Sequence, residues 1–199
     1  MDLEKTMRSL KGRGFVPQHF ATAQEAADYL CSQIENTTVG IGGSKTVEAL
    51  GVYDRLTESN QVFWHWTQGP TEEVYDAAGR AEVYLSSANA LAETGELVNI
   101  DGRGNRVAAL TFAENKRLYL IVSMKKICPD LTSAMERARK VAAPANVPKL
   151  PGDRPCNTTG QCFDCRSPHR GCAVMQIMMF KPMTAKLVEV LLVDEDLGF

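Results

Sequence analysis

Four of the six cysteines of this 199-residue chain lie close together in one short segment. They are Cys156, Cys162, Cys165 and Cys172, with the spacing C-x5-C-x2-C-x6-C. A C-x2-C pair lets two thiolates reach one metal through a tight turn, and the outer cysteines can complete the ligand set. Asparagine, glycine and proline recur between them, so residues 151–173 are predicted to form an irregular Cys-rich loop. Because such a loop buries little apolar material, a metal or a cluster is the best candidate to hold it.

Three interpretations of these cysteines stay open. A 4Fe-4S cluster is favoured, because thiolates are its natural ligands and the spacing lacks the symmetry of two zinc knuckles. A structural zinc held by four thiolates is the alternative metal, and paired disulfides or idle thiols are the third interpretation. His169, inside the loop, is a candidate to replace one cysteine ligand. If one cysteine is released, an exposed iron can act as a Lewis acid on a hydroxy or carbonyl substrate.

Charge and hydropathy exclude several classes of function. The formal net charge is −2 with acidic and basic residues interleaved, which gives no reason to expect nucleic acid or an anionic membrane as partner. No apolar stretch approaches the length of a membrane span, and the first residues lack the pattern of a signal peptide. A cytoplasmic location is therefore expected, where thiols stay reduced and metal binding is favoured over disulfides.

Strands and helices are predicted to alternate along the chain. This alternation indicates a single domain, residues 1–199, with a three-layer α/β/α fold and a mostly parallel sheet. Expected helices cover residues 2–12, 22–34, 71–79 and about 130–141; expected strands cover 38–41, 62–64, 81–86, 106–112, 118–124, 174–180 and 186–193; residues 87–95 are expected to form a polar turn, and the prolines from Pro144 to Pro155 an extended connector.

A glycine turn follows the first apolar strand. Thr38–Ile41 runs into Gly42, Gly43 and Ser44, and helical residues follow directly. A strand, a glycine turn and a helix start in this order point backbone N–H groups at an anion. The spacing is not that of a P-loop. The alternative is an ordinary β–α turn in which Ser44 caps the helix.

Several segments resemble the LUD family, the lactate-utilisation domain proteins. They are GGS (42–44), SANALAETG (87–95), NIDGRGNRV (99–107), KI (126–127) with DL (130–131), AAPAN (142–146) and LGF (197–199). The match runs through nearly the whole chain in the same order. The Cys-rich loop is similar to that of single-domain members with a C-terminal cysteine cluster. The resemblance implies a sheet related to the sugar-phosphate isomerases and CoA transferases, with a pocket at the carboxyl ends of the strands.

The resemblance also suggests which polar residues act. In related transferases and isomerases an acidic loop residue serves as nucleophile or base, so Glu93 and Asp101 are the acid/base candidates. The substrate-binding candidates are Gly42, Gly43, Ser44, Asn89, Asn105 and Lys126. The alternatives are that Asp101 and Asn105 only stabilise a glycine-rich turn, and that Lys126 is a solvated surface lysine.

Cys128 is the remaining notable thiol. It precedes an expected helix start, where the helix dipole would lower the pKa of a thiol, although a packed, unreactive thiol is the favoured interpretation.

Together these features favour an iron–sulfur protein that acts on, or assists oxidation of, a small hydroxy acid such as lactate or a sugar-derived acid. The enzyme class stays open between an isomerase, a lyase and an oxidoreductase component. The Cys-rich loop is expected to pack over or beside the carboxyl-end pocket. Expected partners are a small anionic metabolite and other iron–sulfur subunits or a second copy of the chain. The alternative is a non-catalytic, zinc- or cluster-stapled accessory or sensor domain.

Overall fold

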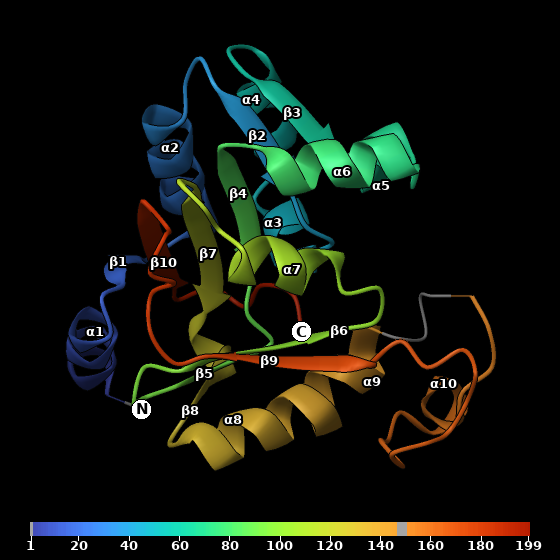
Figure 1. Ribbon diagram of the computed structural model, residues 1–199. Helices are drawn as coiled ribbons and strands as arrows, with labels where there is room; N and C mark the ends of the chain where they lie inside the picture. The colour runs from blue at the N-terminus through green and yellow to red at the C-terminus, as the bar shows by residue number, and fades with distance from the viewer. Residues whose placement is uncertain (1, 147–150) are drawn as a thin grey trace.

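Six short apolar segments form a fully parallel sheet at the centre of the molecule (Figure 1). The computed structural model describes residues 2–146 and 151–199. The strands are β1 (Val16–Phe20), β2 (Thr38–Ile41), β3 (Gln61–Trp64), β4 (Val83–Ser87), β7 (Arg117–Ser123) and β10 (Leu187–Val193), in the spatial order β1-β10-β7-β4-β2-β3. The central strands β7 and β10 are buried along almost their whole length.

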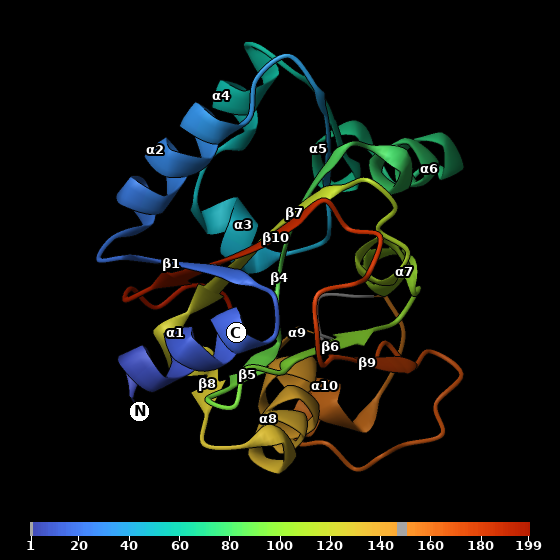
Figure 2. The same ribbon diagram turned by 60° about the vertical axis from the view of Figure 1, so that its left-hand side comes forward.

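Helices cover both faces of this sheet, as Figure 2 shows. On one face α2 (Ala23–Gln33), α3 (Lys45–Ala49) and α4 (Tyr53–Thr57) pack on one apolar core; on the other, α1 (Leu3–Gly12), α6 (Glu72–Arg80) and α7 (Asn105–Thr111) pack on a second. The expected α/β fold with a mostly parallel sheet is confirmed. Thr22 and Glu25 form the capping box that the sequence predicts at the start of α2.

A second sheet lies beyond the carboxyl ends of the parallel strands. Its order is β8 (Ile127–Cys128), β5 (Ala90–Ala92), β6 (Leu97–Asp101) and β9 (Val174–Met178). In Figure 1, α7 lies on one side of this sheet and α8 (Leu131–Arg137) on the other. Leu91 and Leu97 join the core of the main sheet, whereas Val98 and Ile100 pack toward α8. The second sheet therefore lies between the apolar core of the main sheet and a smaller apolar cluster that packs under α8.

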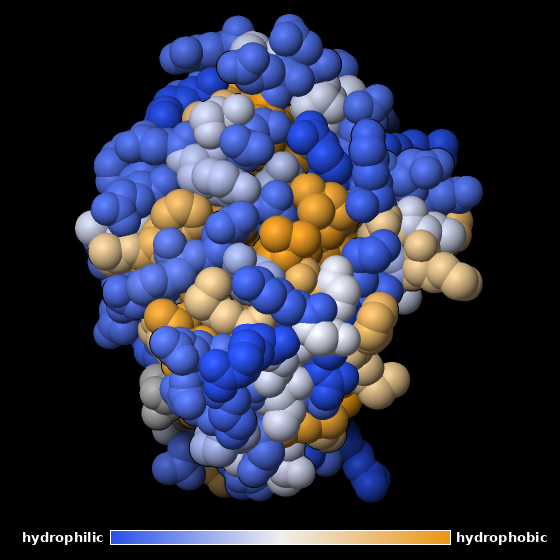
Figure 3. Space-filling view, turned by 90° about the vertical axis from the view of Figure 1, so that its left-hand side faces the viewer, coloured by the Kyte–Doolittle hydropathy of each residue, from blue (hydrophilic) through white to orange (hydrophobic). Residues whose placement is uncertain are grey.

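The remaining elements are short. They are α5 (His65–Gln68), the 3-10 turn η1 (Met124–Lys126), the π-helical turn η2 (Ala138–Ala142) that extends α8, α9 (Ala143–Asn146) and α10 (Pro155–Thr159). The edge strand β1 contains Pro17, which an edge tolerates because one side of the strand has no partner. The face that carries α1 and β1 is largely hydrophilic, with apolar residues gathered near its middle (Figure 3).

Four expectations about local structure were wrong. Residues 106–112 form most of the helix α7 rather than a strand, and the expected turn at 87–95 contains the strand β5. Pro144 lies within α9 instead of an extended connector, and Pro155 begins a helical turn inside the Cys-rich loop. Pro148 falls outside the described residues. A proline fits at position 155 because the first turn of a helix needs no N–H donor from it.

Candidate functional site: a cysteine cavity and a buried cationic network

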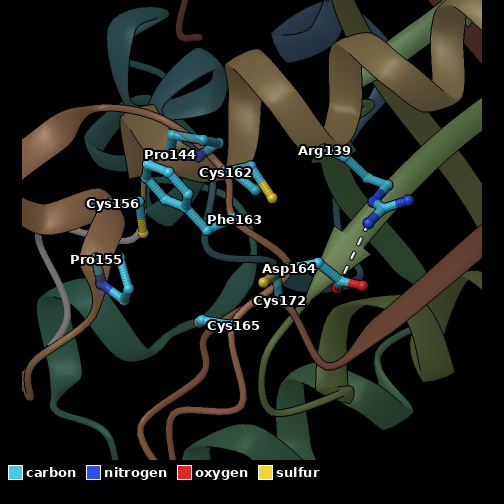
Figure 4. A pocket seen from close by; sticks show the side chains of 10 residues that line it. Arg139, Pro144, Pro155, Cys156, Cys162, Phe163, Asp164, Cys165 and Cys172 are labelled. Carbon is cyan, nitrogen blue, oxygen red and sulfur yellow. Dashed lines mark ion pairs between the residues drawn. The ribbon is translucent and has the colours of Figure 1, made fainter.

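All four clustered cysteines line one cavity (Figure 4). Cys156 is carried by α10, which Gly160 ends in a left-handed conformation. The other three cysteines lie in irregular backbone, and Asp164, between Cys162 and Cys165, is left-handed with φ 48°. That conformation tightens the C-x2-C turn. Also lining the cavity are Phe163, Pro155, Asp164, Arg139, Ala143 and Pro144.

Arginine side chains hold the Cys-rich loop in shape. Arg154 is 6% exposed and donates to the carbonyl oxygens of Pro151 and His169. Arg170 donates to the carbonyl oxygens of Cys165 at 2.9 Å and Cys172 at 3.1 Å. These bonds satisfy carbonyl groups that no regular element pairs. Two cysteines are therefore fixed by backbone contacts that leave their sulfur atoms free for another ligand.

The loop is also attached to the second sheet. The Ala173 N–H donates to the Asp101 carbonyl at 2.9 Å, and Gly102 packs directly against the backbone of Gly171. A β-carbon at position 102 would come within 3.0 Å of the Gly171 oxygen, so glycine is needed for this close approach. The cysteine cavity thus has a fixed position at the end of β6 and β9.

The sulfur atoms do not meet at a single point. Within residues 2–146 and 151–199, no three histidine, cysteine, aspartate or glutamate side chains come close enough to share one metal ion. All six cysteines are free thiols, so the disulfide interpretation finds no support. The ring of His169 packs against Gly152, and His169 is not among the residues that line the cavity. A mononuclear zinc needs all its ligands about 2.3 Å from one centre, whereas a cluster spreads its thiolates over several irons.

Positive charge surrounds this cavity. Asp164 pairs with Arg170 at 2.8 Å and with Arg139 at 3.4 Å, and its pKa is lowered, mainly by the hydrogen bond from Arg170. Burial raises the pKa of the Cys156 thiol, and the nearby Cys165 and Cys172 raise it further. A thiol whose pKa is raised in this way becomes a ligand when a metal or cluster supplies the compensating positive charge.

A cavity of about 340 Å³ adjoins the cysteines. Its lining includes Cys162 and Cys172, the two arginines Arg139 and Arg170, and an apolar wall made by Ile100, Met135, Ala143, Ala173, Val174 and Met175. The volume lies at the lower end of the range for small-molecule sites. Sequence reasoning missed both arginines, because nothing in their spacing relates them to the cysteines.

A separate buried network lies at the carboxyl ends of the parallel strands. Lys126 is only 3% exposed, and its Nζ donates to Thr46 Oγ1 at 2.6 Å and Ser87 Oγ at 3.1 Å. Burial, aided by the nearby charges of Arg137, Lys125 and Arg106, lowers the Lys126 pKa from 10.5 to about 7. The alternative that Lys126 is a solvated surface lysine is therefore wrong.

Arg106 organises the neighbouring loops. Its guanidinium donates to Asn99 Oδ1 and the Ile100 carbonyl at 2.6 Å each, to Asn89 Oδ1 and the Ser87 carbonyl at 3.2 Å each, and lies 3.5 Å from Asp101 Oδ2. Asn89 is therefore a partner of Arg106, and its Oδ1 also accepts from the Ile100 N–H at 2.8 Å. Sequence reasoning placed Arg106 in a strand and missed this role.

The predicted glycine turn lies beside this network. Ser44 caps α3 by accepting from the Val47 N–H at 3.3 Å, and the Gly42 N–H donates to the Leu85 carbonyl at 3.0 Å. Gly42 packs against Tyr84 and Arg106, while a β-carbon on Gly43 would lie 3.4 Å from the His65 ring. The alternative of an ordinary β–α turn, in which Ser44 caps the helix, therefore describes this segment. The helix α3 that follows is only five residues long.

The two candidate carboxylates do not converge. Glu93 follows β5 at the turn of the β5–β6 hairpin, whereas Asp101 ends β6 at the opposite end of that hairpin. Glu93 accepts from Lys5 Nζ and the Asp2 N–H, both at 3.0 Å, and these bonds lower its pKa. Asp101 Oδ1 accepts from the Gly104 N–H at 2.9 Å, stabilising the turn before Asn105, the first residue of α7. Glu93 is thereby placed to anchor α1.

The pKa of the Cys128 thiol is not lowered by a helix dipole, contrary to the hypothesis made from the sequence. Cys128 is buried in β8, and burial raises its thiol pKa instead of lowering it. The favoured interpretation of a packed thiol describes it.

The cysteine cavity and the Lys126 network lie on opposite faces of the second sheet. Asn99, which bonds Arg106, points to the α7 side, and its neighbour Ile100 points to the α8 side and the cysteine pocket. The Cys-rich loop was expected to pack over or beside the carboxyl-end pocket; the cavities that its cysteines line do not include Gly42, Gly43 or Ser44. The segment formed by α8 and η2 contributes to both sites, with Arg137 beside Lys126 and Met135 and Arg139 at the cysteine cavities.

The protein is an α/β protein with a parallel main sheet. A second small sheet lies across the carboxyl ends of the parallel strands, and a polar network lies between the two sheets. Over 96% of this chain and 95% of the other, the fold resembles the crystal structure of a DUF162 family protein from Deinococcus radiodurans, with a TM-score of 0.54 and 13% identity. The model of the LUD domain family matches residues 3–193, and the chain belongs to that family, which is associated with lactate utilisation. No curated protein is similar enough in sequence to match.

In the part of the chain that the structure describes, no helix combines the length and the apolar character that a membrane span requires.

Proposed function

We propose that this LUD domain protein carries a 4Fe-4S cluster on Cys156, Cys162, Cys165 and Cys172, and acts on a small hydroxy acid in the pocket beside it. The observation that carries the proposal is that all four thiols line one cavity. A cluster is favoured over zinc because thiolates are its natural ligands and the cysteine spacing lacks the symmetry of two zinc knuckles.

The adjoining pocket supplies the binding groups for such a substrate. Arg139 and Arg170 present guanidinium groups suited to a carboxylate, and both share Asp164 in the absence of another anion. Ile100, Met135 and Met175 form the apolar wall against which a short carbon chain can pack. When bound by all four thiolates, the cluster would supply electron transfer, and it would supply Lewis-acid chemistry if one cysteine were released.

The residues of this chain then have distinct tasks. Arg139 and Arg170 orient the carboxylate, and Asp164 balances their charge in the empty pocket. The hydroxyl end of the substrate faces Cys162 and Cys172, which line both cavities. We place Glu93 outside this chemistry, because it lies at the far end of the β5–β6 hairpin.

Titration of the reconstituted protein with L-lactate tests the pocket. We expect lactate to change the electron paramagnetic resonance spectrum of the reduced cluster, and we expect Arg139→Met to weaken that response at least about tenfold, since a lost charged hydrogen bond costs roughly 1.5–3 kcal/mol. Arg166→Met is the matched control, because Arg166 lies in the same loop but does not line the pocket. An unchanged spectrum at saturating lactate would contradict the assignment of the pocket.

One observation favours the second candidate, an accessory domain that passes electrons to a partner. Phe163, between two of the cysteines, is 59% exposed, which places an apolar contact point directly beside the proposed cluster. In that case the cluster would form and would exchange electrons with an iron–sulfur partner subunit, but lactate would leave its spectrum unchanged.

A further inference from the structure

The Lys126 network is unused by the proposed function and has the composition of a reactive site. Lys126 Nζ is held by two hydroxyl groups, and among the described residues no carboxylate lies within ion-pair distance of it. The charged groups facing it are Arg137 from α8, Arg106 from α7 and its own neighbour Lys125; Asp101 pairs with Arg106 instead. A buried amine surrounded by cations is stabilised in its neutral, nucleophilic form.

Residues 197–199 cover this site closely. Gly198 has a φ of 66°, and a β-carbon there would overlap Thr46 Oγ1 and lie 3.2 Å from Lys126 Nζ. The carbonyl oxygen of Leu197 accepts from Thr46 Oγ1 at 3.5 Å, and that of Phe199 accepts from Arg137 Nη1 at 3.4 Å. Both distances are at the limit for a hydrogen bond, and the side chain of Leu197 packs in the apolar core, so burial of Leu197 does most to hold this segment.

The hydrogen-bond donors beneath residues 197–199 suit a small molecule that carries a carboxylate and one further oxygen acceptor. Arg137 can take a carboxylate where it now contacts the Phe199 oxygen, and Thr46 can donate to a second oxygen in place of Leu197. The amine of Lys126 lies between them, within reach of the Thr46 and Ser87 hydroxyls. A carboxylate next to a carbonyl group is the arrangement found in a 2-oxo acid.

We propose that Lys126 condenses with the carbonyl carbon of a small 2-oxo acid, forming an imine in a site that residues 197–199 cover. The neutral amine nitrogen bonds to the carbonyl carbon and gives up its two protons, which the Thr46 and Ser87 hydroxyls pass to the carbonyl oxygen. The carbon–oxygen bond then breaks, and that oxygen leaves as water. The condensation needs no oxidant or reductant. It requires residues 197–199 to move, which frees Arg137 and Thr46 to bind the ligand. The inference does not depend on the cysteine cluster.

Borohydride trapping with pyruvate as the probe tests this proposal. Sodium borohydride converts an imine to a stable secondary amine, and peptide mass mapping then locates the adduct. We expect the adduct on Lys126, its loss in Lys126→Arg, and its retention in Lys125→Arg, the adjacent control. Adducts spread over exposed lysines without preference for Lys126 would overturn the proposal, and this mapping needs only the unaltered protein.

The pH dependence of trapping gives a second readout. The neutral amine is the reactive form, so the rate should rise as the pH approaches about 7, the pKa of Lys126, and level off above it. An exposed lysine would keep gaining rate up to its ordinary pKa of 10.5. A rate that continues to increase tenfold per pH unit beyond pH 8 would therefore contradict the site.

Gly198→Ala tests the covering segment. The added methyl group would overlap Thr46, and the φ of 66° disfavours any side chain there, so the change should displace residues 197–199, lower the melting temperature and raise the trapping rate several-fold. An unchanged rate would show that these residues do not control access to Lys126.

Discussion

Arg106 is the residue on which the carboxyl-end loops depend most. It is buried, and its guanidinium contacts acceptors from the ends of β4 and β6 and the loops that follow them. Burial lowers its pKa, although Asp101 opposes this shift. A charged group in such a site is retained only because nearly every donor is satisfied.

Replacing Arg106 by methionine should therefore destabilise the fold strongly. The change leaves Asn99 Oδ1 and the Ile100 carbonyl without their donor and Asp101 without its partner, so we expect a loss of about 3–5 kcal/mol in the free energy of unfolding, measured by urea titration. Arg103→Met is the control: Arg103 is exposed and stacks on Tyr75, and its loss should cost about 0.5 kcal/mol. Equal unfolding midpoints for the two variants would contradict the role of Arg106.

At the level of single residues, sequence reasoning succeeded where spacing along the chain reflects spacing in the fold. The four cysteines lie within one loop and line one cavity, and their binding of a metal or cluster stays a prediction. Arg139 and Arg170 reach the same place from a helix and from the loop, so their proximity follows only from the fold. Glu93 and Asp101 lie close in sequence, but the hairpin between them separates them.

At the level of elements, the closest packing is that of α6 on β2. The position of a β-carbon on Gly40 would overlap the backbone oxygen of Ala78, so only glycine lets the helix approach the strand this closely.

Gly40→Ala should accordingly separate α6 from β2. We expect the free energy of unfolding to fall by about 2–4 kcal/mol, because backbone rather than a flexible side chain must shift. Gly79→Ala in the same helix meets nothing within 4 Å and should be neutral or stabilising by up to about 1 kcal/mol. Thermal unfolding of both variants, followed by circular dichroism, makes the comparison. A Gly40→Ala variant as stable as Gly79→Ala would refute the packing argument.

The helix α7 shows why some elements were mispredicted. Its run from Arg106 to Thr111 is rich in apolar residues and short enough for a strand, yet the buried positions Arg106, Val107, Ala109 and Leu110 follow the helical period. In so short a run a strand and a helix fit almost equally well. The strand β5, only three residues long, gave no periodic signal at all.

At the level of the whole molecule, the second sheet is the feature that the sequence did not reveal. It forms from four short strands contributed by three distant parts of the chain, and only the fold brings them together. As a consequence the molecule has two candidate sites, the cysteine cavity beside the loop after β6 and the Lys126 network at the carboxyl ends of β2 and β4. The six-stranded parallel sheet, by contrast, was predictable from its apolar strands.

The iron and sulfide content of the protein, purified or reconstituted without oxygen, tests the central claim most directly. We expect about four irons and four acid-labile sulfides per chain and broad absorbance near ~400 nm. Cys165→Ser should lose them, whereas Cys31→Ser, which changes a half-buried thiol of α2 away from the cavity, should retain them. A colourless protein that binds one zinc per chain, or a Cys165→Ser variant that keeps the full iron content, would contradict the account.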